Sequence, residues 1–484
     1  MTQKDLEKYL WGAATYLRGT IDAGDYKQYI FPLLFFKRIS DVYEEEYQIA
    51  LKDSDGDLEY ANFEENHRFQ IPDGSHWKDV REVTVNVGMA IQEALRSMEK
   101  ANPDTLDGIF GDASWTNKNR LSDEILINLI EHFSKHNLST ENVPRDQLGD
   151  AYEYLIKEFA DDSGHTAAEF YTNRTVVRLM TLIMDPQPGE SVYDPTCGSG
   201  GLLLNCALQL KDADKEYRTL KLYGQEINLI TSSIARMNMF MHGIEEFDIF
   251  RGDTLAHPGF IEYDELKKFN VILANPPYSI KNWDQKSFEN DPYGRNMLGT
   301  PPVGRADYAF QQHIIKSLDS NNGRSIVLWP YGVLFRDAEK DMREKMIKQD
   351  LVECVIALGK NLFYNSIMES CLLLCRNNKP KHTKNKVLFI DARDEVRKEK
   401  NMSYLDEHHI QKILKTYQNF ETIDGFSYLA EMNEVLEKDA SLNIPLYVMP
   451  KEDSDKQSVN NMFDEWVKSS ESLASSMHEL FEKI

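Results

Sequence analysis

The sequence has few cysteines, no long apolar run and a deficit of basic residues. Its five cysteines are scattered and odd in number, which predicts buried, reduced thiols. Cys371 and Cys375 lack the second pair of ligands that a zinc site needs, so we expect no metal site. No segment reaches the roughly 18 apolar residues of a membrane-spanning helix. The charged start MTQKDLEKYL differs from a secretory signal, so we expect a cytoplasmic protein without membrane association.

The shortage of basic residues bears on nucleic-acid binding. With 55 basic and 79 acidic residues, the chain has a formal charge of −24 at pH 7. A protein that binds DNA unaided is expected to carry a basic surface, because neutralising phosphates supplies much of the affinity. Three alternatives follow: the chain does not bind DNA, a partner supplies most phosphate contacts, or the basic residues are locally concentrated.

Three regions differ in their hydrophobic pattern. Apolar residues at helical spacing predict an N-terminal helical domain over residues 1–145. From 146 to 400, strand-like runs alternate with helical stretches, which predicts an α/β domain with a mostly parallel sheet. We expect the strands to end near residue 391 and residues 401–484 to form a charged helical extension. The predicted fold class is α/β, a mostly parallel sheet with helical regions at both ends.

The end of the chain carries a heptad pattern. Its apolar positions alternate at four and three residues: Val459, Phe463, Trp466, Ser470, Leu473, Met477, Leu480 and Ile484. Such spacing is typical of a coiled-coil seam or of an amphipathic helix. The helix therefore packs either within this chain or on another subunit.

A glycine-rich segment, DPTCGSGG, lies between a short predicted strand and an apolar helix. Glycines there allow a tight turn and a close approach of a ligand to the helix N-terminus. The dinucleotide fingerprint G-x-G-x-x-G is incomplete, because Leu203 occupies its last position. An acidic residue before the loop suits the amino group of S-adenosylmethionine. The candidate cofactor residues of this segment are Asp194, Pro195, Gly198, Ser199, Gly200 and Gly201.

Two further acids follow predicted strands. Glu226 ends the strand LKLYGQE, where a carboxylate can accept hydrogen bonds from ribose hydroxyls. Asp253 follows the third strand and can accept a bond from an adenine amino group. Each acid alone is typical of a surface, but their order along the strand ends predicts a cofactor site.

The tetrapeptide Asn275-Pro276-Pro277-Tyr278 follows the apolar strand VILA. The prolines fix the backbone and remove N–H donors, which leaves the Asn275 side-chain oxygen and the Pro276 carbonyl as acceptors. Two fixed acceptors can hold both hydrogens of an exocyclic amine while Tyr278 stacks on its ring. The sequence thus predicts direct methyl transfer to a planar nitrogen, which in DNA requires a flipped base. No Pro-Cys dipeptide is present, which disfavours cytosine-C5 chemistry.

The ordered motifs FYTN, DPTCGSGG, GQE, GDT and NPPY resemble the gamma class of amino-methyltransferases. Nearly the whole chain is similar to the modification subunits of type I restriction-modification systems. The N-terminal LWGAATYLRGTIDAGDYKQYIFPLLFFKRISDVYEE and the later WPYGVLF, NLFYNSIMESCLLLC and SLNIPLYV carry this resemblance. It implies a Rossmann-like, S-adenosylmethionine-dependent methyltransferase core and a DNA methyltransferase that acts on adenine N6. Cytosine-N4 and protein glutamine-N5 methylation remain alternatives, because they use the same tetrapeptide.

The resemblance also implies site residues and partners. It places Asp307 between the cofactor and base pockets. It also places six further residues at the cofactor site: Glu169, Phe170, Tyr171, Thr172, Asn173 and Arg174. The family usually has proline at the position of Asn173. A separate specificity subunit is expected to bind two modification subunits and to read the sequence of double-stranded DNA. A restriction subunit can join the complex. The acidic charge is then tolerable, and the C-terminal heptad is a candidate docking element.

Overall fold

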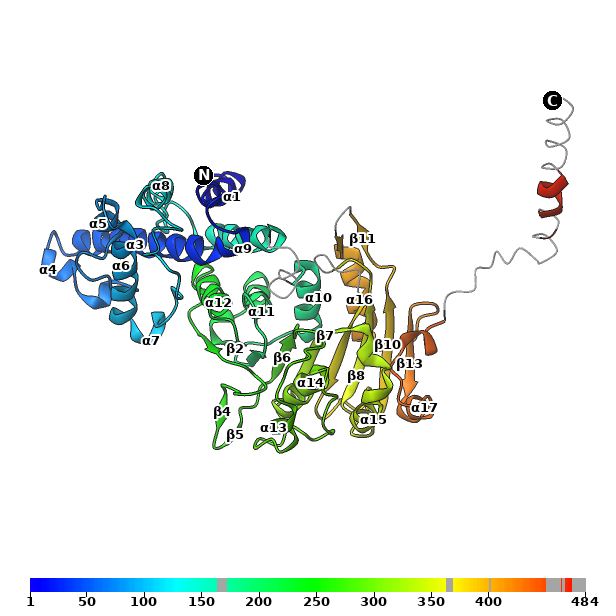
Figure 1. Ribbon diagram of the computed structural model, residues 1–484. Helices are drawn as coiled ribbons and strands as arrows, with labels where there is room; N and C mark the ends of the chain where they lie inside the picture. The colour runs from blue at the N-terminus through cyan, green and yellow to red at the C-terminus, as the bar shows by residue number, and fades with distance from the viewer. Residues whose placement is uncertain (163–171, 363–368, 400–401, 450–462, 464–465, 472–484) are drawn as a thin grey trace, which may run out of the picture.

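The computed structural model describes residues 1–162, 172–362, 369–399, 402–449, 463 and 466–471. Figure 1 shows a helical N-terminal part beside a layered α/β part. The N-terminal helices run as follows: α1 Gln3–Gly12, α2 Ala14–Leu17, α3 Lys27–Asp53, α4 Leu58–Ala61, α5 Trp77–Arg81, α6 Val87–Ala101, α7 Pro103–Leu106, α8 Asp123–Phe133 and α9 Arg145–Asp162. The predicted helical character of this region is confirmed.

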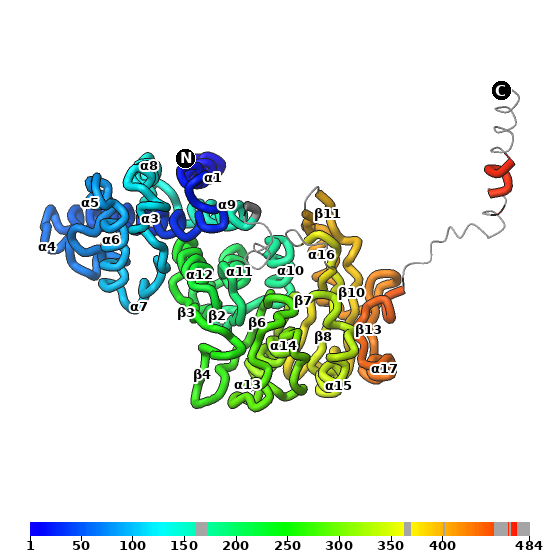
Figure 2. The backbone as a smooth tube through the Cα atoms, in the orientation of Figure 1, coloured from blue at the N-terminus to red at the C-terminus, as the bar shows by residue number. Residues whose placement is uncertain are grey.

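The helical part shares its core with the first helices of the α/β part. Buried side chains of α9 pack with those of α1, α3, α6 and α8. Ile234, Met237 and Phe240 of α12 (Leu229–Met241) join the same cluster. Figure 2 shows α9 and α12 between the N-terminal helices and the sheet. The predicted boundary at residue 145 therefore falls where the chain enters a helix buried in this shared core.

A nine-stranded sheet forms the centre of the α/β part, in the order β13-β10-β8-β9-β7-β6-β1-β2-β3. The strands are β1 Ser191–Asp194, β2 Lys221–Glu226, β3 Phe247–Arg251, β6 Val271–Ala274, β7 Arg324–Pro330, β8 Val352–Leu358, β9 Ser370–Arg376, β10 Lys386–Ala392 and β13 Ser427–Glu431. Neighbours pair in parallel except that β9 is antiparallel to β7 and β8, and β13 to β10. Two small hairpins, β4–β5 (Ile261–Glu262, Glu265–Leu266) and β11–β12 (Arg397–Lys398, Ser403–Tyr404), lie outside this sheet.

Helices cover both faces of the sheet. Alternate residues of a strand point to opposite faces, so Val192 of β1 packs in one layer and Tyr193 in the other. The first layer contains α10 Arg174–Met184, α11 Gly201–Asp212 and α16 Glu407–Asn419. The second contains α14 Asp307–Lys316, α15 Lys340–Lys348 and α17 Met432–Glu437, with the short α13 Gln285–Glu289 beside them. Burial on both faces explains the continuous apolar runs of the central strands.

The expectation that strands end near residue 391 is wrong. β13 pairs with β10 through five residue pairs from Lys386↔Glu431 to Ile390↔Ser427. Its sequence SYLAE has little apolar alternation, because it is an edge strand held mainly by backbone pairing. The predicted helical extension therefore also contributes a strand to the sheet. The five cysteines are free and buried, as predicted. Within the described ranges, no helix is both long and apolar enough to cross a membrane.

A buried histidine at the joint between α9 and α12 makes folding sensitive to acid. His242 is 4% exposed, and its Nδ1 donates to the carbonyl of Asn238 at 3.0 Å. A Cβ atom at Gly149 of α9 would lie only 2.4 Å from the ring of His242. Burial lowers the pKa of His242 to about 4, so the folded protein holds the neutral ring.

We expect the free energy of unfolding to fall by about 2 kcal/mol between pH 7 and pH 5 through His242 alone. The unfolded chain binds a proton below about pH 6.5, whereas the folded chain resists it until about pH 4. Denaturant unfolding at both pH values should show a smaller pH effect in His242→Asn than in the wild type. His408→Asn, at an exposed histidine, is the control and should keep the wild-type difference. Equal pH effects in wild type and His242→Asn would contradict this assignment.

Candidate active site

A cavity of about 470 Å³ opens at the carboxyl ends of β1, β2 and β6. One side is formed by residues that follow β1, β2 and β3, including Pro195, Thr196, Glu226, Ile227 and Asp253. The other side is formed by residues 275–278 and, further along the chain, Ile280, Asn282, Trp283, Phe310, Glu369 and Ser370. A smaller recess adjoins the cavity and shares Thr196 and Asn275 with it.

The glycine-rich loop connects β1 to α11. Gly198 and Gly200 have φ angles of 52° and 79°, in the left-handed region that favours glycine. A Cβ atom at Gly200 would also lie 2.9 Å from the Met239 side chain. Gly198 N–H donates to the Glu226 carboxylate at 3.0 Å, so the loop is held against the end of β2. The loop therefore places its backbone along the recess lined by Gly198, Ser199 and Gly201.

Asp194, at the end of β1, is 1% exposed and lines the recess. Its Oδ1 accepts a hydrogen bond from Thr196 N–H at 3.0 Å. Burial raises the pKa of Asp194 to about 8, against the lowering effect of the Thr196 bond, and the nearby Glu226 adds to the rise. A cation in the recess would stabilise the ionised carboxylate.

The other two predicted acids also lie at the cavity. Glu226 Oε1 accepts from Asn228 N–H at 2.8 Å, while its Oε2 accepts from Gly198. A carboxylate has about four acceptor positions, and these two backbone bonds use one on each oxygen. Asp253 is exposed and its Oδ1 caps the turn that follows, accepting from Leu255 N–H at 2.9 Å. Its other oxygen carries no bond in that cap.

Three of the six residues predicted around the start of α10 are described by the structure, and two of these lie at the recess. Thr172 and Arg174 line the recess, and Arg174 forms an ion pair with Glu153 of α9. Asn173 is 1% exposed and caps α10 by accepting from Thr175 N–H, while its Nδ2 donates to the Ser403 carbonyl. It lines neither the cavity nor the recess, which its role as a helix cap explains. The other predicted residues, Glu169, Phe170 and Tyr171, lie outside the described residues.

The tetrapeptide follows β6, and β6 pairs directly with β1. Asn275 Oδ1 accepts from the Tyr278 hydroxyl at 3.1 Å, and Asn275 Nδ2 donates to Thr172 Oγ1 at 3.1 Å. Burial raises the pKa of Tyr278, so the hydroxyl stays protonated and is the donor in its bond. Thr172 therefore fixes the amide orientation of Asn275, with its oxygen toward Tyr278.

Asp307, expected between the cofactor and base pockets, lines neither the cavity nor the recess. It is 1% exposed and accepts a bond from the backbone N–H of Ser279, directly after the tetrapeptide. Sequence reasoning also missed the apolar lining formed by Ile227, Leu255, Ile280, Trp283 and Phe310. Ile227 and Leu255 were detectable in principle, since each stands within two residues of a predicted acid.

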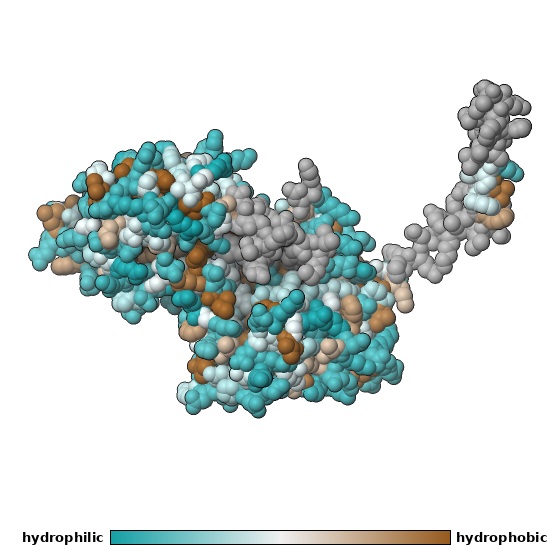
Figure 3. All heavy atoms as spheres, in the orientation of Figure 1, coloured by the Kyte–Doolittle hydropathy of each residue, from teal (hydrophilic) through white to brown (hydrophobic). Residues whose placement is uncertain are grey.

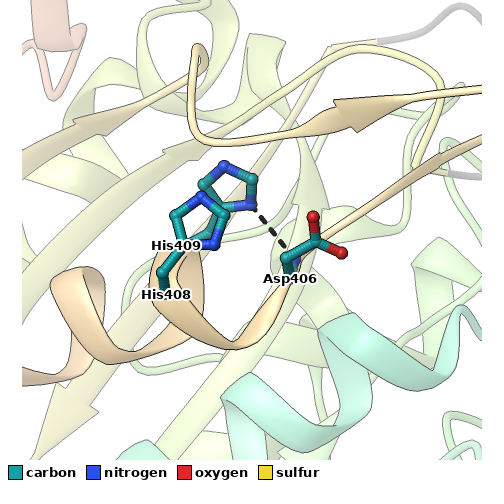
Figure 4. Close-up of side chains that lie close together, drawn as sticks. All are labelled: Asp406, His408 and His409. Carbon is teal, nitrogen blue, oxygen red and sulfur yellow. Dashed lines mark hydrogen bonds between the residues drawn. The ribbon is translucent and has the colours of Figure 1, made fainter.

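A cluster of potential metal ligands lies far along the chain, at the start of α16. Figure 4 shows Asp406, His408 and His409, whose ligand atoms lie within 4.8 Å of one another. The Nδ1 atom of His409 accepts from Asp406 N–H at 3.0 Å, and the Asp406 carboxylate pairs with Arg397 at 2.9 Å. These contacts make the cluster a capping box for α16, with the carboxylate already neutralised by a cation.

Comparisons with known proteins bear on the whole chain. A family model described as N-6 DNA methylase matches residues 143–456, and one described as HsdM N-terminal domain matches residues 6–133. The chain is 32% identical over 465 residues to the type I restriction enzyme MjaVIII methylase subunit of Methanocaldococcus jannaschii, covering 91% of this chain and 78% of that protein. It is 28% identical to the MpnII methylase subunit of Mycoplasma pneumoniae, covering 99% and 96%.

A solved structure agrees with these sequence relatives. The type I restriction-modification methyltransferase subunit from Streptococcus thermophilus superposes with a TM-score of 0.80 at 30% identity. The match covers 93% of this chain and 100% of that one. The similarity therefore includes the helical N-terminal part as well as the sheet.

Proposed function

The chain belongs to the N-6 DNA methylase family, among the modification subunits of type I restriction-modification systems, and from this premise we propose that its cavity binds S-adenosylmethionine beside a flipped adenine. The methyl group would pass to adenine N6. The observation that carries the proposal is that Asp194 and Asn275 line the same recess beside the cavity. Asp194 ends β1 and Asn275 follows β6, and these two strands pair directly. Adjacent strands lie about 5 Å apart, so a ligand held by one carboxylate reaches the other side chain.

The residues of the cavity fit this cofactor. Asp194 offers a buried carboxyl that needs a cation, and the loop after β1 places Gly198, Ser199 and Gly201 along the recess. Glu226 and Asp253 would accept from the ribose hydroxyls and the adenine amino group, and Ile227, Leu255 and Phe310 would contact the ring. When bound, S-adenosylmethionine supplies an activated methyl group on a sulfonium.

On the target side, Asn275 Oδ1 and the Pro276 carbonyl would hold the two hydrogens of the amine. The Tyr278 hydroxyl now occupies one acceptor position of Asn275, so the amine would share or displace that bond. Tyr278 and Trp283 both line the cavity and offer aromatic rings on which a base can stack. The step would be a direct displacement in which the chain aligns the nitrogen with the methyl group. The C–N bond would form as the C–S bond breaks, the sulfur would leave as a neutral thioether, and the proton lost by the methylated amine would pass to solvent.

A labelled-methyl transfer assay tests the function. Plasmid DNA would be incubated with tritiated S-adenosylmethionine and the chain, with and without its cognate specificity subunit, followed by separation of the nucleosides. We expect label in N6-methyladenine when the specificity subunit is present. Label in N4-methylcytosine, or in a protein glutamine, would instead support the alternative substrates of the same tetrapeptide.

We further propose that the chain reaches DNA within a complex of two modification subunits and one specificity subunit, which a restriction subunit can join. The charge of −24 supports a partner that supplies phosphate contacts. Most heptad positions lie outside the described residues, but Phe463 and Trp466 are described and are 60% and 65% exposed. Figure 3 shows apolar side chains on this described C-terminal segment. Exposed aromatic rings at heptad spacing suit docking on the helices of a partner.

Deleting the residues after 455 should prevent co-purification with the specificity subunit, because the proposed docking helix is then lost. The thermal midpoint of the isolated chain should stay the same, since the core lies before that point. A finer test replaces Phe463 and Trp466 by alanine and compares it with alanine at the exposed Lys468 and Ser469. Unchanged assembly of the deletion variant would refute the docking role.

A further inference from the structure

The backbone immediately after the tetrapeptide has an unfavourable conformation. Ser279 has a φ of 50°, in the left-handed region that residues with a Cβ atom rarely adopt. Its backbone N–H donates to Asp307 Oδ1 at 2.6 Å, and its hydroxyl donates to Asp307 Oδ2 at 3.3 Å. The buried carboxylate of Asp307 thus holds both polar groups of Ser279, the residue directly after Tyr278.

Asp307 is itself fixed from two directions. It begins α14, where a carboxylate is favoured by the positive end of the helix dipole. Its Oδ2 also accepts from Arg336 Nη1 at 2.7 Å, across a distance of 29 residues in sequence. Both side chains are largely enclosed, with 0% of Asp307 and 17% of Arg336 exposed, so solvent screens this pair weakly.

Arg336 is in turn anchored on the second helical layer. Its backbone carbonyl accepts from Arg343 Nη1 at 2.7 Å, and Arg343, 1% exposed, also donates to the Ala440 carbonyl at 3.2 Å. A Cβ atom at Gly332 would lie 2.7 Å from Arg336 Nε, so glycine leaves the room that the guanidinium occupies. This chain of contacts links Ser279 to α14, to α15 and to Ala440 in the segment after α17.

We propose that Asp307 and Arg336 are positioning residues, which hold the tetrapeptide in the geometry that methyl transfer requires. This inference rests on the proposed function of the cavity. Neither side chain lines the cavity, so both act through Ser279 rather than on the substrate or cofactor. Their loss should therefore lower kcat while the affinity for S-adenosylmethionine, held by other strands, is kept.

Graded variants at Asp307 test the proposal in the complete complex with its specificity subunit. Asp307→Asn keeps an oxygen for the Ser279 N–H but loses the ion pair, and we expect kcat to fall about fivefold. Asp307→Ala loses both contacts, and we expect a fall of about 50-fold with a cofactor Kd within about threefold of wild type. Asp337→Asn, at an exposed aspartate next to Arg336, is the matched control and should keep wild-type kcat.

A second-site change separates positioning from general stability. Ser279→Gly accepts a φ of 50° without the help of Asp307, so it should restore at least tenfold of the kcat lost in Asp307→Ala. If the alanine variant does not fold, the test is made in Asp307→Asn, where Ser279→Gly should recover most of the roughly fivefold loss and bring kcat to within about twofold of wild type. Wild-type kcat in Asp307→Ala, or no rescue by Ser279→Gly in the folded variants, would overturn the proposal.

Hydrogen exchange provides a readout that does not depend on activity. The amide of Ser279 should exchange at least tenfold faster in Asp307→Ala than in the wild type or Asp337→Asn, in peptides spanning 276–283. If the wild-type complex transfers no methyl group, the proposed function fails. The difference in exchange at Ser279 would still show whether Asp307 holds the loop after the tetrapeptide. Equal exchange in Asp307→Ala and the wild type would overturn the positioning role by itself.

Discussion

Replacing Asn275 by alanine is expected to lower the rate of methyl transfer about 10³-fold, which is the scale measured when one preorganised polar contact is removed from an active site. The affinity for S-adenosylmethionine should change less than about threefold, because the cofactor would be held by the ends of β1, β2 and β3. The variant should fold normally, since the Asn275 side chain is only partly buried.

The geometry of Asn275 explains why one side chain should matter so much. Its Nδ2 donates to Thr172 Oγ1, which fixes the amide plane and turns Oδ1 toward the cavity wall at Tyr278. Pro276 and Pro277 prevent the backbone from relaxing toward the gap that alanine leaves. Without Oδ1 the target amine would keep only one fixed acceptor, and its lone pair would no longer be directed at the methyl group.

Single-turnover transfer of a tritiated methyl group to DNA measures this effect, and calorimetric titration measures cofactor binding. Asn290→Ala, the same change at an exposed residue after α13, is the control and should keep full activity. Tyr278→Phe removes the hydroxyl that occupies Oδ1 but keeps the ring, so its rate should stay within about fivefold of wild type. Full activity in Asn275→Ala would refute the assigned chemistry.

Much of the fold was predictable because the central strands are buried on both faces. Runs such as VILA and RSIVLWP are continuous and apolar for that reason, and glycine, proline and acidic residues mark their carboxyl ends. In parallel strands those ends meet at one edge of the sheet, so motifs 80 residues apart, such as DPTCGSGG and NPPY, could be placed together from sequence.

The unpredicted features depend on tertiary contacts without a local pattern. Asn173 stands beside two residues of the recess, yet its amide caps α10 and contacts Ser403, 230 residues away. Asp307 is likewise directed at Ser279 rather than at a ligand, because Arg336 lies on its other side. β13 is recognisable only through its partner β10. The side chains of Asn173 and Asp307 thus bind backbone groups, and β13 pairs with a strand, that the spacing of residues alone does not reveal.

Asp194→Asn is expected to weaken cofactor binding about 100-fold at pH 7, because the buried carboxylate would lose its ion pair with the amino group of the ligand. Burial raises the pKa of Asp194 to about 8, so the free protein holds this carboxyl mostly protonated at pH 7. Binding a cation favours the ionised form, and close to one proton should be released for each cofactor bound. Between pH 6 and pH 7 the Kd of the wild type should fall nearly tenfold.

The Asp194→Asn substitution should weaken cofactor binding but raise the thermal stability of the ligand-free protein at pH 7. The folded protein binds the Asp194 proton more tightly than the unfolded chain, whose carboxyl has a pKa near 4. This contribution to stability is therefore present at low pH and is lost as the pH rises toward 8. Asparagine avoids that loss, so the ligand-free variant should unfold at a higher temperature than the wild type at pH 7.

Calorimetric titration in buffers of different ionisation enthalpy measures the released protons, and thermal unfolding measures the stability. Asp253→Asn is the control, because its exposed carboxyl has no burial to overcome; it should bind a few-fold more weakly with wild-type proton release. The wild-type protein is thus less stable without ligand because its buried carboxylate lacks the cation that would neutralise it. Proton release that persists in Asp194→Asn would assign the titrating group elsewhere.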